Sequence, residues 1–295
     1  MNLPPELWQT SLPLALGTAF VLGLLHGITP DEHTWPITFS YAIGAYSTRR
    51  GLAAGLWFSA AFTLQRALAS ELAYLALAPW LRNPVVDAVV YLLVGAAMWA
   101  AGLYVRREGQ VWHLHLGPSQ EHRLAARAPG AFRLSPRWAV VHGFLAGWGF
   151  GAYALVIYTV LAPAMKSPWL GWLPGALFGL GTMAVQAVAG ALFGYWMARR
   201  RLPEEAIRRV AQGTAGSTLY WGGLAFALAG AVSLLFPAVR GWAVVTPVAI
   251  PNLHHLGLGF ALVIVTVVGV GLGSLARNLA RVGRDRPEAW ARGGP

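Results

Sequence analysis

The segment HGITPDEHTWP, residues 26–36, interrupts a long apolar stretch and carries most of the polar side-chain atoms of that stretch. The stretch covers residues 12–48, and a single helix of that length would extend about 55 Å, well beyond the about 30 Å core of a bilayer. Gly27 permits an unusual backbone, Thr29 and Pro30 have the pattern that begins a helix, and Glu32 has the capping-box spacing from Thr29. The segment therefore predicts one membrane span that is broken in its middle.

Six further apolar stretches follow, and each is long enough to cross a bilayer at about 20 residues per helix. They cover residues 51–79, 84–105, 138–163, 168–198, 215–237 and 250–277. Hydrophobic residues make up 56% of the chain, charged residues 11%, and the mean hydropathy is +0.53. A soluble domain cannot hide that much apolar surface. The sequence predicts an all-α polytopic membrane protein with about seven transmembrane helices, the first of them broken.

The net charge of +11 comes almost wholly from arginine. A basic excess can indicate nucleic-acid binding, but here the arginines cluster between apolar stretches and indicate topology instead. The clusters at residues 49–50, 106–137, 199–209 and 277–292 fall on one side, with Arg82, Lys166 and Arg240 on the other. We therefore expect a multi-pass protein of the inner membrane, with its N-terminus outside, its C-terminus in the cytoplasm, lipid as a partner and no nucleic-acid partner.

Two similar passages indicate an internal repeat. GLLHG at residues 23–27 is echoed by GFLAG at residues 143–147, and FSAAFTLQRA at 58–67 aligns with LFGLGTMAVQA at 177–187, which pairs Thr63 with Thr182. Three spans per unit give the two units opposite orientations, as in many transporters. The predicted organisation is a first three-helix repeat at 1–105, a basic cytoplasmic loop at 106–137, a second three-helix repeat at 138–237, and an additional helix with a basic tail at 238–295.

Ionisable residues gather at the predicted break, where an unpaired charge at the bilayer centre costs about 2.5–3.5 kcal/mol. Imidazole and carboxylate are suitable ligands for divalent transition metals, and an unwound backbone allows His26, Asp31 and His33 to converge as a metal site. The predicted surrounding residues are Glu32, Gln65, Arg66 and Glu71. The alternative is structural: the two carboxylates complement a helix N-terminus, while the histidines bond to neighbouring spans.

Other histidines leave their roles open. His113, His115 and His122 lie in the basic loop, and His254 with His255 begins the last stretch. The sequence does not decide whether either group binds metal.

Several chemistries are excluded by missing residues or motifs. The chain has no cysteine, which removes disulfides, thiolate ligands and thiol redox chemistry. No phosphate-binding loop of the P-loop type and no H-E-x-x-H motif is present, which argues against ATP hydrolysis and an intramembrane metalloprotease. We predict no enzyme activity and no cofactor.

His26, four residues, then Asp31-Glu32-His33 resembles the signature of the nickel/cobalt transporters, including the urease-accessory type, with one residue inserted before the second histidine. That family is placed in the broader superfamily of the lysine exporters and the cytochrome c biogenesis membrane proteins. Later motifs depart from the pattern, with Phe62 and Thr63 in place of a Gly-His-Ser-like motif and residues 180–182 in place of an acidic one. The missing cysteines set the chain apart from the thiol-redox relatives.

The resemblance implies a secondary transporter of a divalent transition-metal ion, nickel or cobalt first and iron or zinc next, bound at the broken first span. The alternative is an anion or small-metabolite carrier of the same superfamily with Arg66 as the partner of the substrate. The direction of transport, the driving ion and the oligomeric state stay open.

Overall fold

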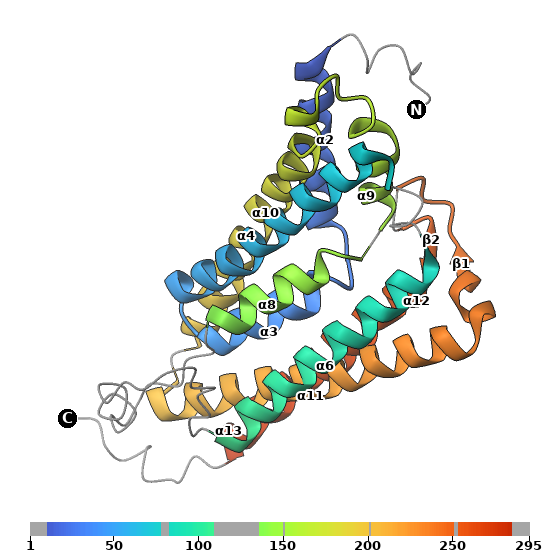
Figure 1. Ribbon diagram of the computed structural model, residues 1–295. Helices are drawn as coiled ribbons and strands as arrows, with labels where there is room; N and C mark the ends of the chain where they lie inside the picture. Colours follow the sequence, from blue (N-terminus) through green and yellow to red (C-terminus); the bar gives the residue numbers. More distant parts are fainter. Residues whose placement is uncertain are drawn as a thin grey trace, which may run out of the picture.

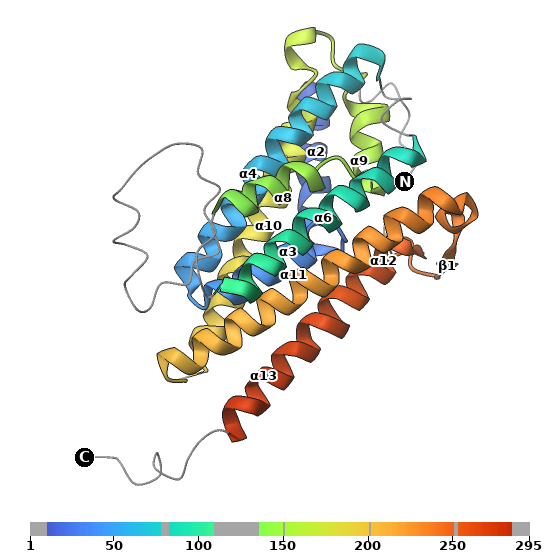
Figure 2. The same ribbon diagram turned by 60° about the horizontal axis from the view of Figure 1, so that its bottom comes forward.

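The computed structural model of the chain describes residues 11–77, 83–108, 136–149, 151–200, 202–250 and 253–284, and most of these residues are helical. Figures 1 and 2 show two groups of long helices. One group holds α2 (Leu12–Ile28), α4 (Thr48–Leu72) and α10 (Leu173–Ala198), and the other holds α6 (Pro84–Glu108) and α11 (Glu204–Leu235). Between the groups lie α3 (Trp35–Ala45) and α8 (Pro136–Ala146).

Shorter elements complete the fold. They are η1 (Ala73–Leu77), α9 (Ala152–Val156), η2 (Ile157–Leu161), η3 (Pro168–Leu170), η4 (Pro237–Gly241), α12 (Leu258–Val263), η5 (Ile264–Leu272) and α13 (Gly273–Arg284). The strands β1 (Ala243–Val245) and β2 (His255–Gly257) pair antiparallel as a hairpin before the last helix.

The break in the first apolar stretch is confirmed, since α2 ends at Ile28 and α3 begins at Trp35. The predicted capping is wrong: the hydroxyl of Thr29 donates to the carbonyl of Leu25 at 3.0 Å, so Thr29 closes α2. A residue before proline is pushed out of the α region, and Thr29 before Pro30 is extended, with φ −70° and ψ 141°. The second half-helix is opened instead by Asp31, whose carbonyl accepts from the N–H of Trp35 at 3.0 Å.

Among the described residues, four helices are long and apolar enough to cross a membrane. They are Val85–Arg106, Pro168–Ala198, Glu205–Leu235 and Leu258–Arg284. The first and fourth predicted spans are split into α2 with α3 and α8 with α9, so neither half is long enough alone. The second, α4, carries Arg49, Arg50, Arg66 and Glu71. The chain is thus an all-α polytopic membrane protein.

Two pairs of helices pack against one another: α2 lies on α10, and α8 lies on α4. A side chain at Gly23 would overlap the carbonyl of Phe178, and one at Gly143 would overlap the carbonyl of Phe58. The two contacts are related by a shift of 120 residues, since Gly143 lies 120 positions after Gly23 and Phe58 lies 120 positions before Phe178. These glycines let helix backbones approach closely, as small residues do in membrane interfaces.

The same spacing recurs along the interface. A side chain at Gly27 would contact Val185, and one at Gly147 would contact Gln65. The two glycines differ by 120 in residue number, and so do Gln65 and Val185. A shift of 120 pairs Phe62 with Thr182, whereas the sequence alignment pairs Thr63 with Thr182. Strings of Gly, Ala and Leu align almost equally well in neighbouring registers.

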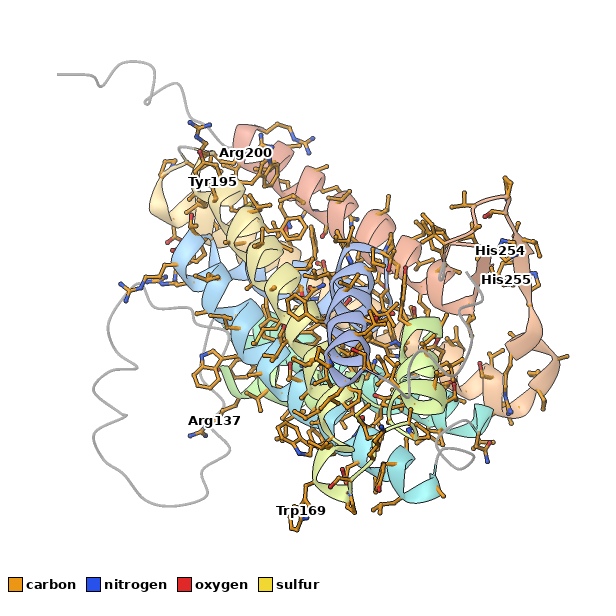
Figure 3. All side chains as sticks on the ribbon, turned by 90° about the horizontal axis from the view of Figure 1, so that it is seen from above. Arg137, Trp169, Tyr195, Arg200, His254 and His255 are labelled. Atoms are coloured by element: carbon orange, nitrogen blue, oxygen red, sulfur yellow. The ribbon has the colours of Figure 1, made fainter. Side chains whose placement is uncertain are left out.

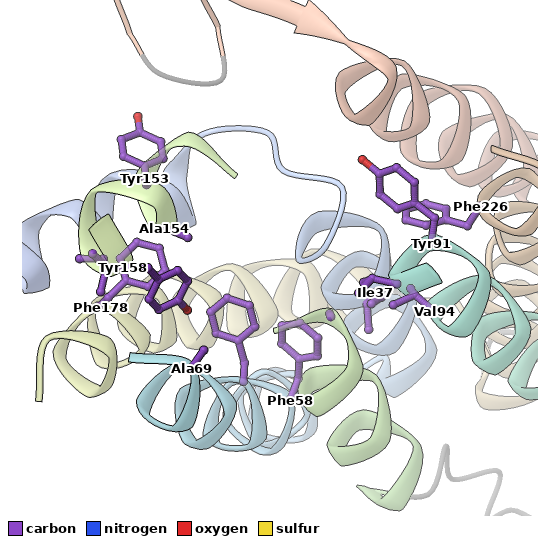
Figure 4. Close-up of a cluster of buried hydrophobic side chains, with 14 of the residues drawn as sticks. Ile37, Phe58, Ala69, Tyr91, Val94, Tyr153, Ala154, Tyr158, Phe178 and Phe226 are labelled. Atoms are coloured by element: carbon purple, nitrogen blue, oxygen red, sulfur yellow. The ribbon is translucent and has the colours of Figure 1, made fainter. Parts of the chain in front are cut away.

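Aromatic side chains fill the space between the helix groups. Figure 4 shows Tyr91 of α6 beside Phe226 of α11, with ring centroids 5.9 Å apart, and Tyr158 and Phe178 at the other end of the cluster. A second cluster joins α3, the end of α10, the start of α11 and α13. The break between α2 and α3 therefore lies within protein.

Candidate functional site

The break frees backbone carbonyls that an unbroken helix would pair, and polar side chains of the facing helix bond to them. The carbonyl of Gly27 accepts from Nε2 of Gln186 at 3.2 Å and from the indole N–H of Trp35 at 3.2 Å. One turn earlier, the carbonyl of Gly23 accepts from the hydroxyl of Thr182 at 3.1 Å. Freed carbonyls at bilayer depth are tolerated only with such partners.

Asp31 lies between the two histidines of the break. Its Oδ2 is 3.7 Å from Nδ1 of His26, and its Oδ1 is 3.8 Å from Nδ1 of His33. All three side chains are buried. The carboxylate of Asp31 is held by the backbone of the same loop, since its Oδ1 also accepts from the N–H of His33 at 2.9 Å. The short loop therefore holds one carboxylate in reach of two imidazoles.

Glu32 and Tyr91 extend this arrangement. Oε1 of Glu32 is 3.4 Å from Nδ1 of His33 and accepts from the hydroxyl of Tyr91 at 3.0 Å. The ring of Tyr91 also stacks on that of His33, with centroids 5.6 Å apart. His26, Asp31, His33, Glu32 and Tyr91 thus form a continuous line of ionisable groups, which we call the buried row.

The imidazoles are tightly enclosed but lack hydrogen bonds. Within the part of the chain that the structure describes, none of the four ring nitrogens of His26 and His33 has a hydrogen-bond partner. A side chain at Gly149, in the break between α8 and α9, would overlap the ring of His33, and one at Gly259 would overlap the carboxylate of Glu32. Buried polar atoms without partners are rare and mark sites that bind or exchange something.

Arg66 is fully buried beside the row, but it makes no ion pair with any described carboxylate. Its Nη1 donates to the hydroxyl of Tyr158 at 3.1 Å, and its guanidinium carbon lies 4.5 Å from the ring centroid of Phe62. Its Nε and Nη2 have no hydrogen-bond partner among the described residues. Among the described residues no ion pair joins Arg66 to Glu71, and aromatic faces hold the cation instead.

The remaining predicted neighbours, Gln65 and Glu71, lie on α4. Gln65 packs against Gly147, and neither of its amide atoms is hydrogen-bonded within the described residues. Glu71 lies farther along α4 beside Gly171. Of the four predicted surrounding residues, Glu32 lies directly against His33, at 3.4 Å.

The predicted metal ligands are His26, Asp31 and His33, but the tightest group of three ligand atoms has Glu32 in place of His26. Ligand atoms of Asp31, Glu32 and His33 all lie within 4.8 Å of one another. His26 stands on the other side of Asp31, against Phe178 with ring centroids 5.1 Å apart. The break therefore gathers four potential ligands in a line.

Five further histidines were candidates for metal binding in the sequence. His113, His115 and His122 lie outside the described residues. His254 and His255 lie side by side at the exposed hairpin (Figure 3), and their ring centroids are 4.5 Å apart.

Sequence reasoning missed Tyr91, Tyr158 and Gly149. Each stands in an apolar or glycine-rich passage that gives no chemical signal by itself. Tyr91 and Gly149 reach the break from another helix or loop, and Tyr158 reaches Arg66. The three glycines within residues 147–151 are a signal for a second break, because glycine is unfavourable inside a helix.

A family model described as cytochrome c biogenesis protein transmembrane region matches residues 67–221. The match begins just after Arg66, so the broken first span precedes it. No curated protein and no solved structure matches the chain.

This match corrects two predictions. The resemblance to the nickel/cobalt transporters was wrong at the level of family, because the matched family is a different membrane family. Transport of a divalent metal and its alternative, an anion or small-metabolite carrier with Arg66 as partner, lose their support with it. Metal-ligating residue types at a break are not specific to transport. The missing cysteines exclude thiol chemistry by this chain, but they do not exclude membership of a family with thiol-redox relatives.

Proposed function

Because the chain belongs to the family of the cytochrome c biogenesis protein transmembrane region, we propose that it serves cytochrome c biogenesis as a membrane protein that passes protons along the buried row. The proposal involves no enzyme activity, since no covalent bond other than that to the proton is made or broken.

The absence of cysteine determines what kind of step is open to the chain. Thiol–disulfide exchange needs an attacking thiolate, and none of the 295 residues provides one. Reduction of a disulfide to two thiols takes up protons as well as electrons. A cysteine-free member of this family is suited to supplying the protons for disulfide reduction, while another component supplies the electrons.

The observation that carries the proposal is the spacing of the buried row. Successive groups are separated by 3.7, 3.8, 3.4 and 3.0 Å from His26 to Tyr91. The first three distances exceed a hydrogen bond, so a small ring rotation or a bridging water completes each link. Chains of Asp, Glu and His inside membrane helices are the usual groups of proton relays.

Two measurements test this function. Deletion of the gene should lower the amount of protein-bound haem in c-type cytochromes, measured by haem staining of membrane proteins. The purified chain in vesicles loaded with a pH-sensitive dye should speed the internal pH change after an applied potential, compared with empty vesicles. Normal haem levels in the deletion strain, or vesicles no faster than empty ones, would contradict the proposal.

We also propose seven spans arranged as an inverted three-plus-three repeat with one appended helix. The paired contacts of Gly23 and Gly143 at a spacing of 120 residues support the repeat. In Figure 2 the start of α4 and α8, the end of α6, and α13 point to the same end of the molecule, and these carry the arginine clusters. By the positive-inside rule that end is cytoplasmic.

Reporter fusions test this topology. A reporter active only in the cytoplasm should work after Arg50, within residues 106–137, after Arg201 and at the C-terminus, because arginine clusters stay inside. Fusions near Arg82 or Lys166 should be silent. Activity at either of these two sites would overturn the seven-span arrangement.

A resident divalent metal ion is a second candidate for the same residues, without transport. The cluster of ligand atoms from Asp31, Glu32 and His33 favours it, and His26 is the remaining predicted ligand. Metal analysis of the purified chain distinguishes the candidates. A stoichiometric metal that is lost when His33 is changed to Ala would favour the metal site, whereas metal-free protein that still moves protons would favour the relay.

A further inference from the structure

The end of the molecule that carries α13 holds an apolar groove of about 400 Å³. The groove runs between α3, α10 and the last helices and is lined by Phe39, Ile43, Leu192, Tyr195, Trp196 and Leu272. Its volume is within the range of small-ligand sites. Leu192 is 60% exposed, so the groove opens outward, where the surrounding medium is lipid.

Two cations stand at the end of this groove and are held by the residues that line it. The guanidinium carbon of Arg200 lies 4.0 Å from the ring centroid of Trp196, and that of Arg199 lies 5.3 Å from the ring centroid of Tyr195. Figure 3 shows Tyr195 and Arg200 together at the end of α10. Stacking on aromatic faces leaves the N–H edges of both guanidiniums free for an anion.

The charge around the groove is positive. Arg277 and Arg281 are exposed on α13, which packs in the same cluster as the end of α10. Among described residues at this end, Glu205 pairs with Arg208 and Arg209 and so does not neutralise the pair at the groove.

We propose that this groove binds one anionic phospholipid, with an acyl chain along the apolar wall and the phosphate on Arg199 and Arg200. Guanidiniums bind phosphate oxygens by paired hydrogen bonds, and basic pockets between spans are suited to anionic headgroups. An apolar groove leading away from the cations selects a lipid over a free phosphate, because the phosphate has nothing to place in it.

The test is native mass spectrometry of the full chain in neutral detergent, with phosphatidylglycerol or phosphatidylcholine of identical acyl chains added. We expect the parent to retain phosphatidylglycerol preferentially and to retain no glycerol phosphate. The double change Arg199→Gln and Arg200→Gln should weaken phosphatidylglycerol binding about tenfold, an estimate reduced for solvent exposure. Leu192→Trp, which fills the groove and keeps both cations, should also lower retention.

The matched control is Arg106→Gln, because the guanidinium of Arg106 stacks on Tyr220 at 4.5 Å but does not border the groove. This variant should bind phosphatidylglycerol like the parent. Equal retention of the two lipids, parental binding by the double variant, parental binding by Leu192→Trp, or equal losses in Arg106→Gln and the double variant would each overturn the proposal.

Discussion

Replacing Asp31 with Asn is expected to lower the rate of proton movement into dye-loaded vesicles about a hundredfold, the lower range for losing a positioned proton-transfer group. Among the described residues, Asp31 is the carboxylate that lies near both histidines, at 3.7 and 3.8 Å. An amide at this position cannot take up and release a proton at neutral pH. Its oxygen still accepts from the N–H of His33, which Asp31 now bonds at 2.9 Å, so the loop should keep its conformation.

The control for this prediction is Glu205→Gln, which makes the same chemical change at an exposed carboxylate far from the row. It should leave the proton rate unchanged. Thermal unfolding in detergent should show both variants folded. Haem staining of the deletion strain carrying Asp31→Asn should resemble the uncomplemented strain. Parental proton rates in the folded Asp31→Asn variant would show that the row is not the path.

Changing Gly23 or Gly143 to Ala is expected to lower the free energy of unfolding by about 1–3 kcal/mol, the range for overpacking. In each case the new methyl group would overlap a backbone carbonyl, of Phe178 or of Phe58, which cannot rotate aside. The helices must separate, and close backbone contact is what joins helices in lipid. If the two halves are repeats, the two losses should be similar.

Gly17→Ala is the matched control, because this glycine lies in the same helix as Gly23 and a side chain there meets nothing within 4 Å. It should be neutral or slightly stabilising, since alanine is favoured over glycine in helices by about 1 kcal/mol. The measurement is thermal unfolding in one detergent for all three variants. If Gly23→Ala and Gly143→Ala were as stable as Gly17→Ala, the proposed backbone contacts would be refuted.

The family match leaves out most of the buried row, and of its members only Tyr91 lies inside the match. The match starts at residue 67, whereas His26, Asp31 and His33 all precede it. The assignment to the family therefore comes from α6, α8, α10 and most of α11, and the role of the buried row depends on its geometry. The proton and haem measurements above connect the two.

Much of the fold could be predicted because its causes are local. Apolar stretches of bilayer length predict membrane helices, and the glycine and proline of residues 27–30 predict the break, which α2 and α3 confirm. The family could not be predicted from the His-Asp-His spacing, because these residue types suit a metal, a proton or a helix terminus equally well. The missing cysteines remove thiol chemistry from this chain, but they do not separate it from a family with thiol-redox relatives.

By itself the sequence determined that the chain is helical, resides in a membrane and breaks its first span, since each follows from hydropathy and from backbone limits at Gly27 and Pro30. Only the tertiary structure decided which groups meet at that break. Tyr91 reaches Glu32 from α6, and Gln186 reaches the carbonyl of Gly27 from α10. Arg66 contacts the side chains of Tyr158 and Phe178 instead of a carboxylate. These contacts join residues tens to more than a hundred positions apart, so they depend on how helices pack, which no local pattern encodes.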